Sequence, residues 1–168
     1  MKKIIIARIV LIVLILGWMN MIFGFSAATD VESQSLSDKI TIKVVHIIKP
    51  DYDSLSEKEQ LIIFGRTSFG VRKLGHLCEY TMLGVLTSLF LATFASIRES
   101  LRYRRRILLG AGLWVLVYAI SDEIHQGFVH GRSPEVRDVL IDLVGGLIGA
   151  LIVLVIVRLI KMKRTNND

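Results

Sequence analysis

Residues 139–160 read VLIDLVGGLIGALIVLVIVRLI, an apolar stretch with one acid near its start and one arginine near its end. An α-helix needs about 20 such residues to cross the ~30 Å hydrocarbon core of a bilayer. Three further apolar blocks precede it, at about 4–25, 74–97 and 107–128, and most charged residues lie between the blocks. The chain is therefore expected to be an all-α integral membrane protein with four transmembrane helices.

The amino-acid composition excludes other classes of protein. The 168 residues, with a mean hydropathy of +0.56, are expected to form a single domain over 1–168. One cysteine cannot pair within the chain, which excludes a disulfide-stabilised scaffold. The net charge of +6 comes from residues that flank the apolar blocks and are not interleaved with aromatic residues. The expected partner is thus the lipid bilayer, and no nucleic-acid partner is expected.

Basic residues are concentrated in two places. Arg132 and Arg137, between the third and fourth blocks, are balanced by Glu135 and Asp138. Arg98, Arg102, Arg104, Arg105 and Arg106 crowd the short link between the second and third blocks, and Arg158, Lys161, Lys163 and Arg164 follow the fourth block. The lysines and arginines of 26–73 are balanced by seven acids. The positive-inside rule predicts a multi-pass protein of the cell membrane with cytoplasmic N- and C-termini. The segment 26–73 and the link after Gln126 are then outside.

The first block has two interpretations. Ser26-Ala27-Ala28 resembles the small-residue site at which a signal peptide is cleaved. The apolar stretch before it is longer than the ~7–15 residues of a signal core, which favours a retained helix.

The outer segment shows helical periodicity. Leu36, Ile40, Val44 and Ile47/Ile48 form an apolar stripe, and the opposite stripe holds Lys39, Lys43, His46 and Lys49. This pattern predicts a short amphipathic helix on the outer membrane surface. A strand over 40–44 is the alternative, but its alternation fails at Val45. Ser56 and Glu59 have capping-box spacing before 61–64, which predicts a second short helix. Both helices could also be simple covers over the bundle.

Polar residues occur where lipid is expected. Only 15 residues, Ile107–Ser121, are free of charge in the third block, and they span about 22 Å. The helix must therefore continue through 122–126 to cross the bilayer. The second and fourth blocks also begin with polar faces, which predicts a polar cluster at the extracellular end of the bundle. Its candidate members are His76, Glu79, Tyr80, Asp122, Glu123, His125, Gln126, Arg132, Arg137, Asp138 and Asp142.

Three interpretations of this cluster remain open. The acids could simply pair with Arg72, Arg132 and Arg137. The cluster could instead bind or act on a polar head group, because ionisable groups inside a membrane are candidates for function. A metal site is disfavoured because HExxH and paired-cysteine spacings are absent from the sequence, so no metal and no cofactor are expected. Separately, Gly145 and Gly149 form a small-xxx-small pattern that favours close helix packing.

These residues resemble the signatures of the VanZ-like membrane protein family. The first signature is Arg72-Lys73-x-x-His76-x-x-Glu79-Tyr80-x-x-Leu83-Gly84. The second is Asp122-Glu123-x-x-Gln126-x-Phe128, followed by Gly131-Arg132, Asp138, Asp142 and Gly145. Phe25-Ser26 is similar to the family's segment after its first helix. The chain departs from the family in having His130-Gly131-Arg132 for Pro-Gly-Arg, and Ala27-Ala28 after Ser26.

The resemblance implies a bacterial cell membrane and a link to teicoplanin resistance, with which the founding member is associated. We hypothesise a protein that lowers sensitivity to such lipoglycopeptides by binding them, or a lipid-linked cell-wall precursor, at the outer face. Asp122 and Glu123 would be central contacts, Arg132 and Arg137 would hold a phosphate or carboxylate, and Asp138 and Asp142 would complete the polar wall.

Two alternatives belong to other classes. The first is an enzyme acting on a lipid-linked substrate, with His76 or His125 as general base, oriented by Glu79 or an acid of the third block. The second is a small accessory or assembly subunit, which the pair Gly145 and Gly149 suggests.

Overall fold

The computed structural model describes residues 1–27, 30–94, 101–131 and 133–165. Over these residues the chain is helical and contains no strand, so the all-α prediction is confirmed. The elements are α1 (Lys2–Ala27), α2 (Asp30–Ile48), the 3₁₀ helix η1 (Tyr52–Ser54), α3 (Glu57–Ala92), α4 (Leu101–Gln126) and α5 (Val136–Thr165).

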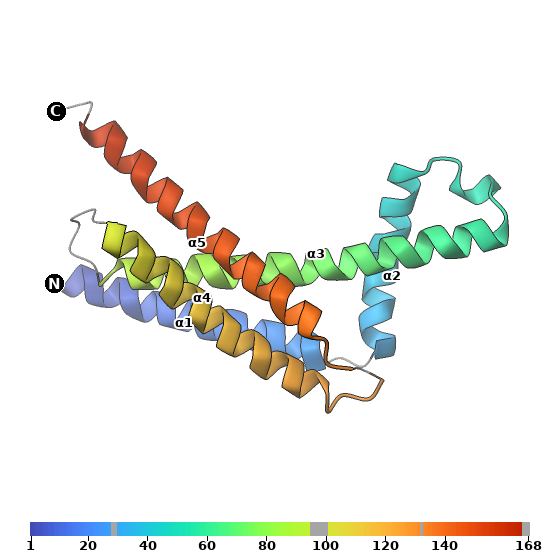
Figure 1. Ribbon diagram of the computed structural model, residues 1–168, viewed down its shortest axis with the longest axis horizontal. Helices are drawn as coiled ribbons and strands as arrows, with labels where there is room; N and C mark the ends of the chain where they lie inside the picture. Colours follow the sequence, from blue (N-terminus) through green and yellow to red (C-terminus); the bar gives the residue numbers. More distant parts are fainter. Residues whose placement is uncertain (28–29, 95–100, 132, 166–168) are drawn as a thin grey trace.

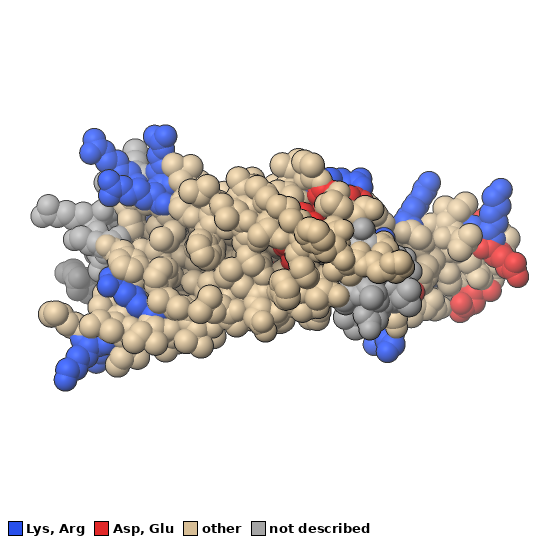
Figure 2. Space-filling model, turned by 90° about the horizontal axis from the view of Figure 1, so that it is seen from below, with Lys and Arg blue, Asp and Glu red and all other residues tan. Residues whose placement is uncertain are grey.

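Four of the helices, α1, α3, α4 and α5, are long and apolar enough to cross a bilayer. They form one elongated bundle, with the start of α1 and the end of α5 at the same end (Figure 1). Lysine and arginine side chains gather at that end, and a broad belt without charge follows it along the bundle (Figure 2). The chain is therefore a multi-pass membrane protein. We call this end the basic end, and the end where α1 and α4 finish the polar end.

The segment before the second span differs from the prediction. The expected short helix at 61–64 is not separate, because α3 runs without a break through its 36 residues from Glu57 to Ala92. The capping pattern does mark its start, since Glu59 Oε2 accepts the Ser56 backbone N–H at 3.1 Å. Glycines and basic residues interrupt the apolar pattern over 65–73, but this segment contains no proline that would end the helix. At about 54 Å, α3 extends well beyond a ~30 Å hydrocarbon core.

The amphipathic segment is a helix, α2, as the periodicity predicts, and the strand alternative is wrong. It ends at Ile48, just before Pro50. α2 runs transverse to the spanning helices and crosses α3 near the polar end, and α3 continues past it to the tip of the molecule (Figure 1). Thr41 and Val45 of α2 are completely buried.

The third and fourth spans have bounds close to those expected. α4 continues through Asp122 to Gln126, as the length of its apolar stretch requires. α5 begins three residues before the expected span 139–160 and continues past it to Thr165. The end of the second span, 95–97, lies outside the described residues.

α3 and α5 approach each other until their backbones touch. A Cβ atom on Gly149 would lie 2.1 Å from the Thr81 carbonyl oxygen, and one on Gly84 would lie 2.2 Å from that of Gly146. A Cβ on Gly145 would lie 2.6 Å from the Leu77 carbonyl oxygen. Larger side chains at these positions would push the helices apart. Gly145 and Gly149 of α5 thus pack against the backbone of α3 in the same chain.

α1 is joined to α3 and α4 by specific contacts. Ile22 is buried in the same apolar core as Leu83 and Val115. The Trp18 indole N–H donates to the Glu79 carbonyl oxygen at 2.8 Å, and the Tyr118 hydroxyl donates to the Met19 carbonyl oxygen at 2.5 Å. These contacts make α1 part of the bundle.

The glycine contact gives a prediction about packing. Gly149→Ala should destabilise the protein by about 1–3 kcal/mol, because the new methyl group meets α3 backbone that cannot move aside. The matched control is Gly75→Ala, since nothing lies within 4 Å of a Cβ at Gly75. Alanine there should be neutral or stabilising by up to about 1 kcal/mol. Thermal unfolding in one detergent measures both. Equal midpoints for the two variants would contradict the close approach.

His46 joins α2 to the turn that follows it. Its Nδ1 lies 2.8 Å from the Ile42 carbonyl oxygen, and its Nε2 lies 3.2 Å from both carboxylate oxygens of Asp53. Both partners accept hydrogen bonds, so the doubly protonated ring fits the site. The bond to Ile42, followed by the bond to Asp53, raises the pKa of His46 above its usual 6.5.

This contact predicts a pH-dependent turn. Because the folded-state pKa is raised, the contact contributes fully below about pH 6.5 and is lost as pH rises through the folded-state pKa. Amide hydrogen exchange over 46–55, corrected for its intrinsic pH dependence, should therefore show less protection at higher pH. In His46→Gln the protection should be lower and independent of pH over this window. An identical pH response in that variant would exclude His46 as the cause.

Candidate functional site

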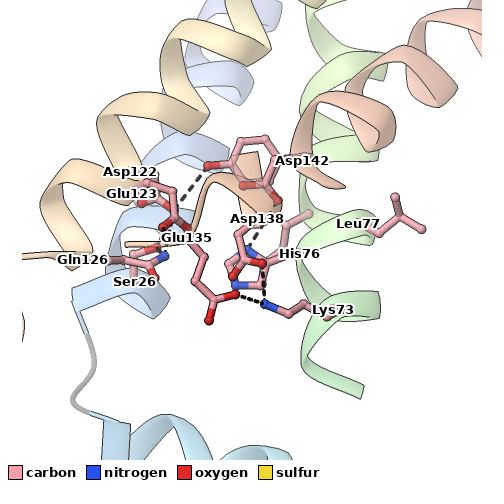
Figure 3. A network of polar contacts seen from close by, with 12 residues as sticks. Ser26, Lys73, His76, Leu77, Asp122, Glu123, Gln126, Glu135, Asp138 and Asp142 are labelled. Carbon is pink, nitrogen blue, oxygen red and sulfur yellow. Dashed lines mark hydrogen bonds and ion pairs between the residues drawn. The ribbon is translucent and has the colours of Figure 1, made fainter. Parts of the chain in front are cut away.

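Polar side chains from four helices meet at the polar end of the bundle (Figure 3). We call the following set the polar cluster. It comprises Ser26 from α1; Lys73, His76 and Tyr80 from α3; Asp122, Glu123 and Gln126 from α4; Glu135 before α5; and Asp138 and Asp142 from α5.

Asp122 lies where α1, α3 and α4 meet. It is 2% exposed, and its Oδ2 accepts the Ser26 hydroxyl at 2.8 Å and the Tyr80 hydroxyl at 3.3 Å. The Gln126 amide, one turn later on α4, donates to the same oxygen and to Ser26 Oγ, each at 3.2 Å. Three donors therefore converge on one carboxylate oxygen. Its other oxygen, Oδ1, is buried without a hydrogen-bond partner.

Asp142 and His76 face each other between α5 and α3. Asp142 is completely buried, and its Oδ1 lies 3.4 Å from His76 Nδ1. Neither oxygen of Asp142 makes a hydrogen bond of good geometry. Asp142 comes one turn after Asp138 and directly precedes the glycines that bring α5 against α3. The close packing of the two helices thus brings this acid to the imidazole.

Lys73 is the cation at the partly exposed edge of the cluster, where it pairs with Asp138 and Glu135. Its ammonium group makes a short hydrogen bond to Asp138 Oδ1 and lies 3.5 Å from Glu135 Oε2. Lys73 is mostly buried, whereas the Arg137 side chain is 61% exposed and pairs with Glu135 at 2.9 Å. Asp138 thus pairs with a lysine, because α3 presents Lys73 directly to the start of α5.

Glu123 fixes the connection before α5. Its Oε2 accepts the Glu135 backbone N–H at 2.7 Å, while its Oε1 is buried without a hydrogen bond. The hydrogen bond from Arg137, helped by the charge of Lys73, lowers the pKa of Glu135. The connection before α5 is therefore bonded to α4 through Glu123 and to α3 through Lys73.

Several expected site residues lie elsewhere or have another environment. The His125 ring stacks on Phe23 of α1, with 4.1 Å between ring centroids. Arg137 lies at the exposed rim. The backbone carbonyl of Glu79 accepts a hydrogen bond from the Trp18 indole N–H. Arg132 lies outside the described residues.

Ser26 and Lys73 are members of the cluster that are absent from the candidates chosen by sequence, although both lie in the stretches that resemble the family. Ser26 is 3% exposed and hydrogen-bonded to Asp122. The available signals were the Phe25-Ser26 pair and the position of Lys73 one turn before His76.

The arrangement is rich in hydrogen-bond acceptors. Four buried carboxylate oxygens, from Asp122, Glu123 and Asp142, accept no hydrogen bond from the part of the chain that the structure describes. Burying such groups is costly unless they are protonated or meet a donor. In the described part of the chain, no three histidine, cysteine or acidic side chains are grouped as a metal ion would require. The cluster can therefore accept hydrogen bonds from hydroxyl or amine groups, or transfer protons.

The comparison with protein families covers nearly all of this architecture. A family model described as VanZ/LLP1 matches residues 11–158. This chain belongs to the VanZ/LLP1 family. The match includes every member of the polar cluster and the glycine contact between α3 and α5. Searches of curated proteins and of solved structures gave no match.

The Ser26 contact gives a test of the cluster. Ser26→Ala removes a donor from a buried carboxylate and should lower the free energy of unfolding by about 1–3 kcal/mol. The control is Ser121→Ala, because the exposed Ser121 hydroxyl donates only to the Tyr118 carbonyl of its own helix. That change should stay within about 0.5 kcal/mol of wild type. Thermal unfolding compares the two variants. An equal loss of unfolding free energy in both would contradict the contact of Ser26 with Asp122.

Proposed function

We propose that this VanZ/LLP1 protein binds the polar head of an amphiphilic ligand in its polar cluster, at the outer face of a bacterial cell membrane. The four buried carboxylate oxygens without hydrogen bonds carry the proposal. Acids at this depth of a membrane protein are costly, and such groups are functional candidates by default. A ligand that supplies donors would offset that cost when it binds.

The proposed orientation puts the basic end in the cytoplasm. In Figure 2 the lysines and arginines of that end are not mixed with acids, whereas those at the polar end are, and the positive-inside rule favours the first as the cytoplasmic side. Both termini would then be cytoplasmic, and the polar cluster would open toward the outer leaflet. This is the leaflet that an amphiphile from outside the cell reaches first.

The chemistry of the cluster favours a ligand with hydroxyl or amine groups. The oxygens of Asp122, Glu123 and Asp142 accept hydrogen bonds, so they suit sugar hydroxyls or ammonium groups. The anion contact hypothesised for Arg137 would require it to leave Glu135, to which it is bonded at 2.9 Å. A phosphate on the same ligand could bind at that exposed rim, outside the buried part of the cluster.

The family link suggests which ligand to test first. Teicoplanin carries an acyl chain and sugars, so its chain would lie in the leaflet while its donors reach the cluster. A lipid-linked cell-wall precursor has the same division into apolar tail and polar head. We infer that the protein lowers lipoglycopeptide sensitivity by binding one of these molecules.

A second candidate function rests on the His76–Asp142 pair. A carboxylate 3.4 Å from Nδ1 can orient the imidazole and stabilise its protonated form, which is how general bases are held in hydrolases. Asp142 on α5 replaces Glu79 and the acids of α4 as the orienting group. The protein would then be an enzyme acting on a lipid-linked substrate. The accessory-subunit alternative has lost its support, because Gly145 and Gly149 contact α3 of the same chain.

The test is drug susceptibility of a sensitive Gram-positive host. Wild type should raise tolerance to teicoplanin over an empty vector, with little effect on vancomycin, which lacks the acyl chain. Asp122→Asn with Glu123→Gln should abolish this effect, because it removes two carboxylates from the cluster. The matched control is Asp51→Asn with Glu57→Gln, which makes the same charge change at exposed positions. That variant should protect as wild type does.

All proteins are compared at equal membrane levels and with unfolding midpoints measured, so that misfolding is separated from loss of function. Protection by the cluster variant equal to wild type would overturn the site assignment. Absence of protection by wild type would overturn the drug link. Tolerance that scales with protein amount supports binding, whereas protection that is complete at low protein levels and lost in His76→Gln supports the enzyme.

A further inference from the structure

The position of α2 is set by its short connection to α1. Only two residues separate Ala27, the last residue of α1, from Asp30, the first of α2. Three peptide units span at most about 11 Å, so α2 begins close to the level at which α1 leaves the bilayer. From there it runs transverse to the spans (Figure 1). α2 therefore lies near the membrane surface at the polar end.

Two contacts fix how α2 is rotated about its axis. Thr41 and Val45, one turn apart, are completely buried, and α2 packs on α3. His46 contacts Asp53 and the Tyr52 ring, both in η1. Residues 49–56, which include η1, lie beyond α2 on the side away from the bundle (Figure 1). The His46 side of α2 therefore faces away from the membrane.

The remaining apolar stripe then faces the bilayer. At about 100° per residue, Ile40, Val44 and Ile47 lie about 120°, 160° and 100° from His46. Ile40 is 50% exposed and Ile47 is 78% exposed, so the described part of the chain leaves both largely uncovered. We call Ile40, Val44 and Ile47 the α2 stripe.

Two lysines border the α2 stripe. Lys39 and Lys43 are exposed, and they lie between the stripe and His46 on the side of α2 away from α3. Lysines at the edge of an apolar stripe can extend their ammonium groups to the level of lipid phosphates while their stems cover apolar surface. Charge and apolar surface are thus arranged as in helices that lie in a membrane interface.

We propose that α2 is an interfacial helix whose stripe, Ile40, Val44 and Ile47, enters the acyl boundary of the leaflet at the polar end, with Lys39 and Lys43 contacting lipid phosphates. Leaflet lipid is the occupant, because the stripe faces toward the spanning part of the bundle, where lipid surrounds the chain. The helix fixes the depth of the polar cluster, since Ser26 of the cluster lies four residues before α2. This inference is independent of what the cluster binds.

The test measures the depth of single positions in the full-length protein. Cys78, the only cysteine, is first changed to alanine. Ile40→Cys and Ile42→Cys are then labelled separately with an environment-sensitive fluorophore in phosphatidylcholine vesicles containing phosphatidylglycerol. The two positions are a matched pair: both are isoleucines, 50% and 37% exposed, on the same helix. They point about 160° apart.

The label at position 40 should show blue-shifted emission and quenching by doxyl-labelled lipid. The label at position 42 should be quenched by aqueous iodide instead. Lys39→Gln with Lys43→Gln should shift the emission at position 40 toward the red, because the helix loses its phosphate contacts. Equal quenching at both positions would overturn the proposal. A blue shift at position 40 that disappears as protein is diluted in lipid would also overturn it, and would assign the stripe to a second copy.

Discussion

The backbone contact between α3 and α5 is the constraint on which the rest of the polar end depends. Glycines at 84, 145 and 149 let the two helices approach to a distance that no side chain would permit. Asp142 and Asp138 lie one and two turns before this contact on α5, and α3 carries His76 and Lys73 opposite them. Without the close approach these groups would lie too far apart to pair. The glycines therefore position the acids, although they have no polar chemistry of their own.

The second organising feature is the cost of burying carboxylates. Asp122, Glu123 and Asp142 are all less than 5% exposed. The cost is partly offset by donors from several elements: a serine from α1, a tyrosine from α3 and a backbone N–H from the connection before α5. Each of these contacts also ties two elements together. The carboxylate oxygens that accept no hydrogen bond from the described residues, one of which lies 3.4 Å from the His76 ring, are the basis of the proposed binding role.

The long helix α3 links this cluster to the surface of the membrane. Its spanning part lines the cluster, and its N-terminal part holds α2 and the His46–Asp53 turn outside the bundle. Because α2 also follows α1 after two residues, it is restrained at both ends. An amphiphile approaching the cluster would meet the surface of this restrained helix in the same leaflet.

The sequence by itself determined the four apolar helices, the amphipathic α2, the polar end and the family, because these depend on local hydropathy and motif spacing. Only the tertiary structure decided that α3 is one helix, that Lys73 pairs with Asp138, and that Ser26 holds Asp122. The last two pairs join residues 65 and 96 positions apart. Such pairings depend on how each helix is rotated and which neighbour it meets. Those properties are set by packing, above all by the glycine contact of α3 with α5, and no local pattern contains them.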